Sequence, residues 1–531
     1  MTADPLGHTL DRRSLLRLGG IGVVGAAAAL VLPSCGSGGT TAATTTTVHP
    51  TTTAEPLDAA AWSQLAGSLH GHLVRPGDPT YLVDLQLYDP RYDGMRPAGI
   101  AYCASPSDVQ RCLDFARRHA LPFAARAGGH SYGGYSTTTG LVIDVTSMQA
   151  VTLGDGTATV GAGARLIDVY SALNAHGVSI AAGSCPTVGI AGLTLGGGQG
   201  VVGRLHGLTC DQLSSVDLVT PDSHLRTVSK ANDPDLFWAC QGGGGGNFGI
   251  ATAFTFRTFP VGDVTTIYLR FPWAAAPDLL PAWLAWAPHA PDELWANCLL
   301  GSNPGASAPL AQVAGVFVGS SGSASSLVQR LIGAVGASPI EQSVNPTSFA
   351  HAMYLEGGCA QLTQAECHLP TQTSQGRLQR LAGMAKSQYV TQPMSASTVA
   401  TLLNGVAERH GAPGATSSAV NIDAYGGAIN RVDAADTAFV HRDALACIQY
   451  TASIDVGQSA STSQASQQWL DQIYDSVHAD LAPQAYQNYV DPTMSDWAAE
   501  YYGANLGRLQ SVKKAVDPDD AFHFAQSIPL P

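Results

Sequence analysis

Three glycine-rich stretches, each near the end of a strand-like run, constrain this chain more than any other feature. They cover residues 127–134, 183–200 and 242–249 of a 531-residue chain that holds 58 glycines. Glycine tolerates positive φ and lets backbone N–H groups come close to a ligand, and successive N–H groups form concave nests for pyrophosphate. Tight turns alone would explain one such stretch. Three stretches, one with His130 and one with Cys185, instead predict ligand-binding loops.

The glycine pattern does not fit the classical dinucleotide fold. A Rossmann site uses one G-x-G-x-x-G that opens a helix after the first strand, with an acidic residue about 20 positions further on. The run from Gly196 to Gly200 lacks that context. The sequence therefore predicts a phosphate site of a different architecture.

The first 35 residues have the features of an export signal. Arg12 and Arg13 precede an apolar run from Leu18 to Leu32, which is shorter than the about 20 residues that a membrane-spanning helix needs. The arginine pair resembles a twin-arginine signal, the type that carries folded, cofactor-loaded proteins, although Asp11 stands before it in place of Ser or Thr. An uncleaved N-terminal anchor is the alternative. We expect the mature protein to lie outside the cytoplasmic membrane.

The end of this segment resembles a lipoprotein processing box with Cys35 as the lipidated residue, although Pro33 fits that pattern poorly. Residues 36–60 are mostly Gly, Thr, Ala and Pro without apolar periodicity, which predicts a flexible tether. Contact with a membrane is expected only through this candidate lipid anchor.

The composition of the rest excludes several classes of protein. Hydrophobic residues make up 45% of the chain, which excludes disorder of the whole chain. The 26 Lys and Arg against 40 Asp and Glu give a net charge of −14, and no basic run is present, so nucleic-acid binding is not expected. The closest cysteine pairs, Cys103 with Cys112 and Cys359 with Cys367, are candidates for disulfides in an exported protein. No His/Cys spacing suggests a metal site.

Short apolar runs and helical periodicities alternate along the body of the chain. Ser105 and Pro106 mark a helix start, because a polar cap followed by proline is typical of that position. The apolar patterns predict strands at 98–103, 121–126, 141–145, 157–160, 250–259, 313–318 and 420–425, and helices at 167–176 and 325–335. The chain is therefore predicted to be an α+β protein of two or three packed units.

Four motifs in order resemble the berberine-bridge-enzyme-like flavoproteins, which have the vanillyl-alcohol-oxidase or PCMH type of FAD-binding fold. They are Arg126–His130, Cys185–Gly189, Gly242–Gly249 and Tyr501–Asn505. The resemblance implies a two-subdomain FAD-binding domain over residues 61–265. It also implies a substrate domain over 266–483, with an antiparallel sheet backed by helices, and a C-terminal segment over 484–531 that returns to the FAD domain.

The resemblance implies that His130 binds the 8α-methyl group of FAD covalently and that Cys185 binds C6 of the same ring. Imidazole and thiolate are nucleophiles that can attack an electron-poor flavin. The resemblance places further residues at the FAD, namely Arg126, Gly128, Gly129, Ser131, Tyr132, Val188, Gly189, Gly192, Leu193, Gly197, Gly198, Gly200, Gly246, Asn247, Gly249, Ile250, Tyr502 and Asn505.

The family's catalytic base is matched by Tyr489, in the stretch from Ala485 to Asp491. A phenol has a pKa near 10, so a tyrosinate base needs that pKa lowered by the site. Tyr486 as the base, or Tyr489 as a packing residue, are the alternatives. Tyr425 and Asp423 are further candidates to line the pocket and could equally be ordinary sheet residues.

The resemblance thus implies an oxidase that takes hydride from a CH–OH group of a carbohydrate, a glycosylated compound or a polycyclic natural product, with O₂ as acceptor and H₂O₂ as product. Val188 favours O₂, because Val at this position goes with oxidases of the family and Leu or Ile with dehydrogenases. The alternatives are an oxidative cyclase, a dehydrogenase with another acceptor, or a binding protein that kept the fold without catalysis.

Overall fold

The computed structural model describes residues 55–412, 415–454 and 460–531. The predicted export signal, Cys35 and most of the predicted tether lie outside these residues. Helix α2 (Ala59–Ser68) begins within the stretch predicted as tether, because the Asp58 carboxylate accepts a hydrogen bond from the Ala61 N–H and caps the helix. In the described ranges, no helix combines the length and the apolar character needed to span a bilayer.

A four-stranded mixed sheet forms the first subdomain. Its order is β1 (His72–Val74), β2 (Gly99–Tyr102), β4 (Leu141–Asp144) and β3 (Phe123–Arg126), with β2, β4 and β3 parallel. Helix α4 (Pro106–Arg118) connects β2 to β3, and the Ser105 hydroxyl caps it by accepting from the Asp108 N–H, as the sequence predicted. This β–α–β unit ends at the first glycine-rich stretch.

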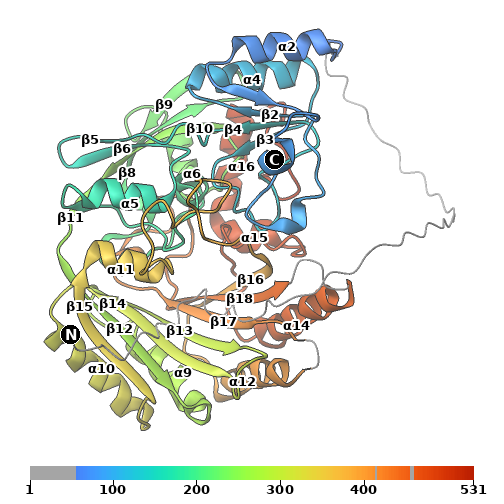
Figure 1. Cartoon of the computed structure of the whole chain (residues 1–531). Coiled ribbons are helices and arrows are strands. Elements are labelled where there is room, and N and C mark those ends of the chain that lie inside the picture. The colour runs from blue at the N-terminus through green and yellow to red at the C-terminus, as the bar shows by residue number, and fades with distance from the viewer. Residues whose placement is uncertain (1–54, 413–414, 455–459) are drawn as a thin grey trace.

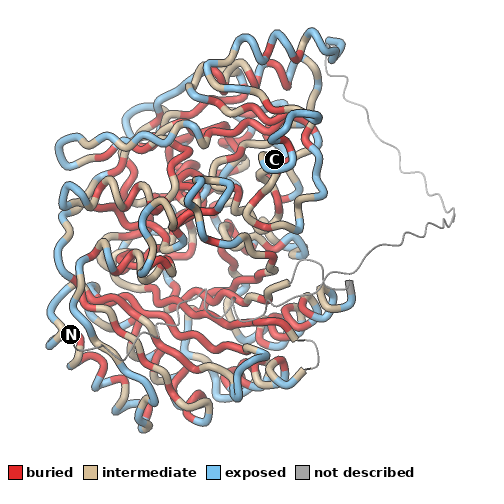
Figure 2. The backbone as a smooth tube through the Cα atoms, viewed as in Figure 1, coloured by how far each residue is buried: buried red, intermediate tan, exposed pale blue. Residues whose placement is uncertain are grey.

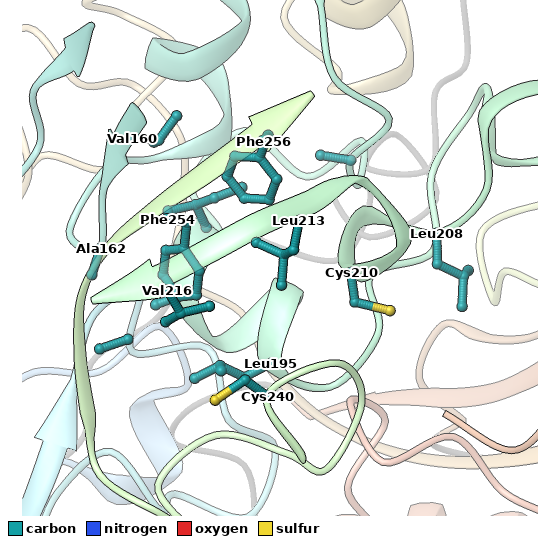
Figure 3. Close-up of a cluster of buried hydrophobic side chains, with 14 of the residues drawn as sticks. Val160, Ala162, Leu195, Leu208, Cys210, Leu213, Val216, Cys240, Phe254 and Phe256 are labelled. Carbon is teal, nitrogen blue, oxygen red and sulfur yellow. The ribbon is translucent and has the colours of Figure 1, made fainter. Parts of the chain in front are cut away.

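A five-stranded antiparallel sheet forms the second subdomain. Its order is β5 (Val151–Leu153), β6 (Thr157–Gly161), β10 (Ile250–Arg257), β8 (Leu213–Val219) and β9 (Leu225–Ser229). Figure 3 shows its apolar face, where strand residues such as Phe254 and Phe256 meet Leu195 and Cys240 from the segments that cover the sheet. Helices α5 (Leu166–Asn174), α6 (Ile190–Leu195) and α8 (Pro234–Ala239) belong to this subdomain.

A seven-stranded antiparallel sheet forms the other half of the molecule (Figure 1). Its order is β15 (Glu341–Ser348), β12 (Asp263–Phe271), β14 (Leu310–Phe317), β13 (Leu294–Ser302), β17 (Ser418–Ala424), β18 (Ala446–Ile454) and β16 (Ala382–Val390). Helices α9 (Ala276–Trp286), α10 (Ser321–Val335), α12 (Ala396–Gly411) and α14 (Ala460–His478) cover one face. The strands are largely buried except for the edge strand β15, and the outer sides of the helices are exposed (Figure 2).

The C-terminal segment crosses back to the glycine loops, where α15 (Trp497–Tyr502) and α16 (Leu506–Val516) lie beside the first two sheets (Figure 1). The fully buried Lys513 ammonium donates to the Asn247 carbonyl at 3.1 Å and pairs with Asp517 at 2.7 Å. The Ile528 N–H donates to the Asn247 side chain at 2.9 Å. The tail therefore fixes the third glycine-rich stretch from behind.

The α+β class, with an antiparallel sheet backed by helices, is confirmed. One predicted strand, 250–259, is divided, because β11 (Phe259–Pro260) leaves the β10 sheet and pairs with β7 (Val178–Ser179). The remaining short elements are α3 (Tyr81–Asp84), η1 (Pro90–Tyr92), α7 (Gly203–His206), η2 (Thr209–Gln212), η3 (Trp273–Ala275), α11 (Phe349–Glu356), α13 (Ala428–Arg431) and η4 (Gly503–Asn505).

The two candidate disulfide pairs differ. Cys359 and Cys367 are bonded, and both are fully buried. Cys103 and Cys112 are also fully buried, but their sulfur atoms lie 3.9 Å apart as two thiols. One of the two pairs is therefore closed in this structure.

Candidate functional site

One large cavity lies between the glycine loops and the seven-stranded sheet. Its volume is about 1150 Å³, and its wall includes residues of all three glycine-rich stretches, of the sheet and of the C-terminal segment. The predicted base Tyr489 lies on this wall. So do most of the residues predicted to bind FAD, namely Arg126, Gly128, Gly129, His130, Ser131, Tyr132, Cys185, Val188, Gly189, Gly192, Leu193, Gly200, Gly246, Asn247, Gly249, Ile250 and Tyr502.

The loops that carry His130 and Cys185 are in direct contact. A Cβ placed on Gly128 would lie 2.3 Å from the Gly189 nitrogen, and one placed on Gly189 would lie 2.4 Å from the Gly128 nitrogen. Only glycine at both positions permits this approach, because real Cβ atoms do not come that close to backbone. The His130 Nε2 lies 3.0 Å from the Thr187 hydroxyl, two residues beyond the exposed Cys185. The two residues predicted to hold one flavin ring are therefore on neighbouring loops.

The His130 ring is held from a second side by Tyr88. The two rings stack with their centroids 3.9 Å apart and their planes 20° from parallel. The backbone N–H of Tyr88 donates to the Gly129 carbonyl at 3.0 Å, so the segment before η1 runs along the first glycine-rich stretch. The sequence carried no signal for this contact.

Several buried polar atoms on the wall lack a hydrogen-bond partner among the described residues. They are Nη1 of Arg126, Oγ1 of Thr137, and Oε1 of Gln487 and Gln526. Burying an unpaired polar atom costs free energy, so a wall with several of them is suited to a ligand with many donors and acceptors. Arg126 is also paired with the buried Asp144 through Nε. Together with the glycine approach, these atoms fit a large phosphate-containing cofactor such as FAD.

The third glycine-rich stretch is shaped by Asn247 and Tyr502. The Asn247 side-chain amide and the Tyr502 hydroxyl each donate to the Gly243 carbonyl at 3.0 Å. Gly244 and Gly246 have positive φ values of 88° and 78°, which favour glycine. Asn247 and Tyr502 thus hold this loop in its curved form at the cavity wall.

Four predicted residues are not part of the cavity wall, and each has another role. Gly197 and Gly198 have positive φ and are packed against Phe439 and Thr209, so they shape a turn. The Asn505 amide donates to the Ala434 carbonyl at 2.7 Å, away from the cavity. The fourth residue is Tyr425.

Tyr425 lies behind the wall. Its side chain is fully buried, its hydroxyl donates to the Gln199 side chain at 3.1 Å, and it contacts the Tyr389 hydroxyl at 3.2 Å. Burial raises the pKa of Tyr425 well above its ordinary value, which opposes ionisation. Within the described residues, the Tyr425 hydroxyl is linked to the cavity wall through Gln199. Asp423, which lies in β17 one residue before the end of that strand, is on the wall itself.

The two tyrosines considered for the base have different surroundings. Tyr486 is buried, and its hydroxyl oxygen accepts from the N–H groups of Gly198 at 3.0 Å and Gln199 at 3.2 Å and from the Asn488 amide at 2.9 Å. Burial outweighs these hydrogen bonds and raises the pKa of Tyr486. Tyr489 is half-buried, with its ring 6.2 Å from that of Tyr132 and 4.9 Å from that of Tyr486. Both tyrosines lie on the cavity wall, but the Tyr486 hydroxyl already accepts three hydrogen bonds from the protein.

Polar side chains of β17 and β18 lie where the seven-stranded sheet lines the cavity. Along β17, Val420 and Ile422 pack into the helix-side core, so Asn421 and Asp423 point to the opposite face, on the cavity wall. The Asn421 amide donates to the Asp423 carboxylate at 3.0 Å, while the Asn421 carbonyl oxygen has no partner within the described ranges. On β18, the Gln449 amide donates to the Tyr132 hydroxyl at 3.0 Å. Asn421 and Gln449 were missed at the level of sequence, although the polar–apolar alternation of β17 is a signal for Asn421.

Comparison with known proteins gives matches along the chain. A family model of the FAD binding domain matches residues 97–229, and a model described as berberine and berberine like matches residues 485–529. The uncharacterized FAD-linked oxidoreductase YgaK of Bacillus subtilis is 32% identical over 471 residues, which are 87% of this chain and 97% of that protein. The carbohydrate oxidase of Microdochium nivale is 29% identical over 487 residues, 85% of this chain and 92% of that protein.

Solved structures share the fold. Physcomitrella patens BBE-like 1 superposes with a TM-score of 0.80 at 28% identity, over 88% of this chain and 99% of that chain. Phl p 4, a grass pollen allergen with glucose dehydrogenase activity, superposes with a TM-score of 0.76 at 28% identity, over 86% of this chain and 97% of that chain. An isoleucine-to-valine variant of Phl p 4 that is a glucose oxidase gives a TM-score of 0.76 at 27% identity, over 86% and 96%.

Proposed function

The chain belongs to the berberine-bridge-enzyme-like FAD-linked oxidoreductases, and we propose that it is an oxidase of CH–OH groups in polyhydroxylated substrates, carbohydrates above all. The observation that carries this proposal is the polar strip of Asn421, Asp423 and Gln449 on the sheet, which lines the same cavity as the glycine loops. A substrate bound there donates hydroxyl hydrogens to carboxylate and amide oxygens and places a carbinol carbon toward the glycine loops.

The apolar neighbours of this strip suit a sugar ring. Trp295 and Leu299 lie on the same wall from β13, next to β17. An indole provides a flat apolar surface for the C–H face of a ring, while the strip serves its hydroxyl groups. Carbohydrate oxidase activity in the Microdochium nivale relative supports this substrate class.

FAD bound in the glycine loops supplies the hydride acceptor. We propose two covalent links, one to His130 and one to Cys185, because these nucleophilic side chains lie on contacting loops at the same cavity. Thr187 holds the His130 ring through Nε2, and Arg126 with the glycine N–H groups serves the pyrophosphate.

Tyr489 is the proposed general base. It takes the hydroxyl proton of the substrate as hydride leaves the adjacent carbon, so charge does not build up on the alkoxide. Its position between Tyr132 and Tyr486, at the wall that also holds Asp423, supports this role.

Dioxygen is the proposed electron acceptor. Val188 lies on the cavity wall three residues after Cys185, and its small side chain leaves room that a Leu or Ile would fill. Phl p 4 has glucose dehydrogenase activity, whereas its isoleucine-to-valine variant is a glucose oxidase. Val188 is the candidate for the equivalent position here.

Export is proposed from Arg12 and Arg13 and lipidation from Cys35, both outside the described residues. Replacing both arginines by lysine should leave the flavin-loaded protein in the cytoplasm. Unchanged export of that double variant would refute a twin-arginine route.

A peroxide screen tests the proposed activity. The purified protein is mixed with a panel of neutral mono- and oligosaccharides and aromatic alcohols, and H₂O₂ and O₂ uptake are measured. We expect H₂O₂ in step with product for at least one carbohydrate, and Asn421→Ala should raise KM more than the exposed control Asn345→Ala. A flavin that dithionite bleaches but no sugar reduces would refute a carbohydrate oxidase.

A further inference from the structure

The segment between α11 and β16 contacts Tyr88, whose ring stacks on His130, and the loop that carries Cys185. This segment, residues 357–381, holds the Cys359–Cys367 disulfide, which closes a ring over residues 359–367, and we call the segment the strap. It is anchored on α5 by the Asp168 carboxylate, which accepts from the Gln364 amide at 2.8 Å and pairs with His368 at 3.0 Å. The proposed chemistry does not use the strap.

The strap reaches His130 through Tyr88. Its buried residues Cys359, Cys367, Leu369 and Leu378 form one apolar cluster with Ile167 of α5, and the half-buried Tyr88 packs against this cluster. On the backbone side, the Arg380 guanidinium donates to the Leu87 carbonyl at 2.6 Å and pairs with Asp93. The residue before Tyr88 is thus fixed by the strap, and the Tyr88 ring is fixed between the strap and the His130 ring.

The strap also reaches the Cys185 loop. A Cβ placed on Gly357 would lie 3.2 Å from the Ser184 carbonyl oxygen and 3.4 Å from Pro186 Cδ. These two residues flank Cys185 in sequence. The strap therefore supports the surroundings of both attachment residues: its disulfide cluster packs against Tyr88, and Gly357, beside the disulfide, packs against the loop of Cys185.

We propose that Tyr88 is a positioning residue for covalent attachment of the flavin at His130, and that the strap holds Tyr88 and the Cys185 loop in place. The proposal rests on the proposed covalent links. His130 gains one C–N bond at the 8α-methyl carbon. The two hydrogens that this bond replaces, one from the methyl group and one from the imidazole, leave with an electron pair to dioxygen as H₂O₂.

Two contacts together define the direction of the imidazole nitrogen that attacks. Stacking on Tyr88 fixes the plane of the His130 ring, and the Thr187 hydroxyl at Nε2 fixes its rotation within that plane. Without the stacked ring, the His130 side chain regains its rotamer freedom. The His130 side chain must then be ordered before it can react, and this unfavourable step slows covalent attachment of the flavin.

The first experiment measures flavin attachment at His130 without the link to Cys185. In a Cys185→Ala background, Tyr88→Leu and Tyr88→Phe are purified in the same way, and flavin is measured before and after acid precipitation. Tyr88→Leu should lower the ratio of attached to released flavin by about 10-fold or more, with total flavin unchanged, because small misplacements of reacting groups cost up to about 100-fold in rate. Tyr88→Phe, which keeps the stacked ring, should restore the ratio.

The matched control measures flavin attachment at Cys185 without the link to His130. In a His130→Ala background, Tyr88→Leu should leave attachment at Cys185 unchanged. Equal attachment by the Leu and Phe variants would overturn the positioning role, and so would loss of total flavin in the Leu variant, since Tyr88 would then build the binding site itself. Absence of attached flavin in Cys185→Ala with Tyr88 intact would instead refute the proposed link to His130.

The role of the strap is tested by the double variant Cys359→Ala with Cys367→Ala in both single-link backgrounds. Attachment should fall in each, since the strap contacts Tyr88, which stacks on His130, and also contacts the loop that carries Cys185. Cys298→Ala, which removes a buried thiol from the opposite side of the seven-stranded sheet, is the control. Attachment equal to that control in both backgrounds would show that the strap has no part in it.

Discussion

The contact between Gly128 and Gly189 can be tested by adding a single methyl group. In Gly189→Ala the new Cβ would lie 2.4 Å from the Gly128 nitrogen and 2.9 Å from its Cα, whereas ordinary contact begins at 3.4 Å. Both neighbours are backbone atoms, so the two loops must separate by about 1 Å to relieve the clash. No side-chain rotation can absorb this change.

The separation acts on the flavin site first. The His130–Thr187 hydrogen bond joins the same two loops at 3.0 Å, and a 1 Å displacement would break it. We expect a loss of about 1–3 kcal/mol in stability from overpacking, and a drop of about 10²-fold in the rate of covalent attachment from the misplaced groups.

The assay compares melting temperature and acid-stable flavin in Gly189→Ala, wild type and Gly333→Ala. Gly333 lies within α10, where a new Cβ meets no atom within 4 Å. This control should attach flavin like wild type and melt at or slightly above the wild-type temperature, because alanine is favoured over glycine inside a helix. If Gly189→Ala melts and retains flavin like the control, the two loops do not converge as described.

Two further outcomes follow from the site, and a third follows from His441, a buried histidine between the Gln484 side chain and the Tyr501 carbonyl. Tyr489→Phe should keep flavin bound but slow its reduction by substrate about 10²–10⁴-fold, and unchanged stopped-flow reduction near neutral pH would exclude Tyr489 as the base. Val188→Leu should slow reoxidation by O₂ without slowing reduction, and equal reoxidation in the variant would remove Val188 from the oxygen path. Burial lowers the pKa of His441 to about 4, below the about 6.5 of an unfolded histidine. The unfolded chain thus binds the proton first, and stability present above about pH 6.5 is lost as pH falls toward 4. Between about pH 6.5 and about pH 4, the free energy of unfolding of the wild type should fall by up to about 3 kcal/mol relative to that of His441→Gln, as measured from melting curves. An equal pH dependence in the two proteins would contradict a neutral buried ring.

The features that the sequence predicted correctly depend on residues close together in the chain. Ser105 and Pro106 begin α4 because a cap and a proline act within one helical turn. His130 and Cys185 stand beside glycines whose approach brings their loops together, and that requirement is visible as glycine-rich sequence. The α+β architecture follows from apolar periodicity in the same local way.

Contacts between distant segments explain what the sequence did not reveal. Tyr88 is a single aromatic residue outside any motif, and only the path of the chain over Gly129 brings it onto His130. Tyr425 was predicted at the pocket because it stands at a strand end next to glycines, but β17 ends at Ala424 and the Tyr425 side chain packs into the core beside Tyr389. Asn505 belongs to a recognised motif, yet its amide is used by the carbonyl of Ala434.

The central claim is that two glycine loops hold one flavin through His130 and Cys185. Trypsin should cut at Arg126, Arg165 and Arg204, which places His130 and Cys185 in two adjacent peptides, 127–165 and 166–204. Mass spectrometry of the digest should find these two peptides joined by a single FAD, with neither present in free form. Recovery of both peptides unmodified, with the flavin released into the supernatant on denaturation, would contradict the account.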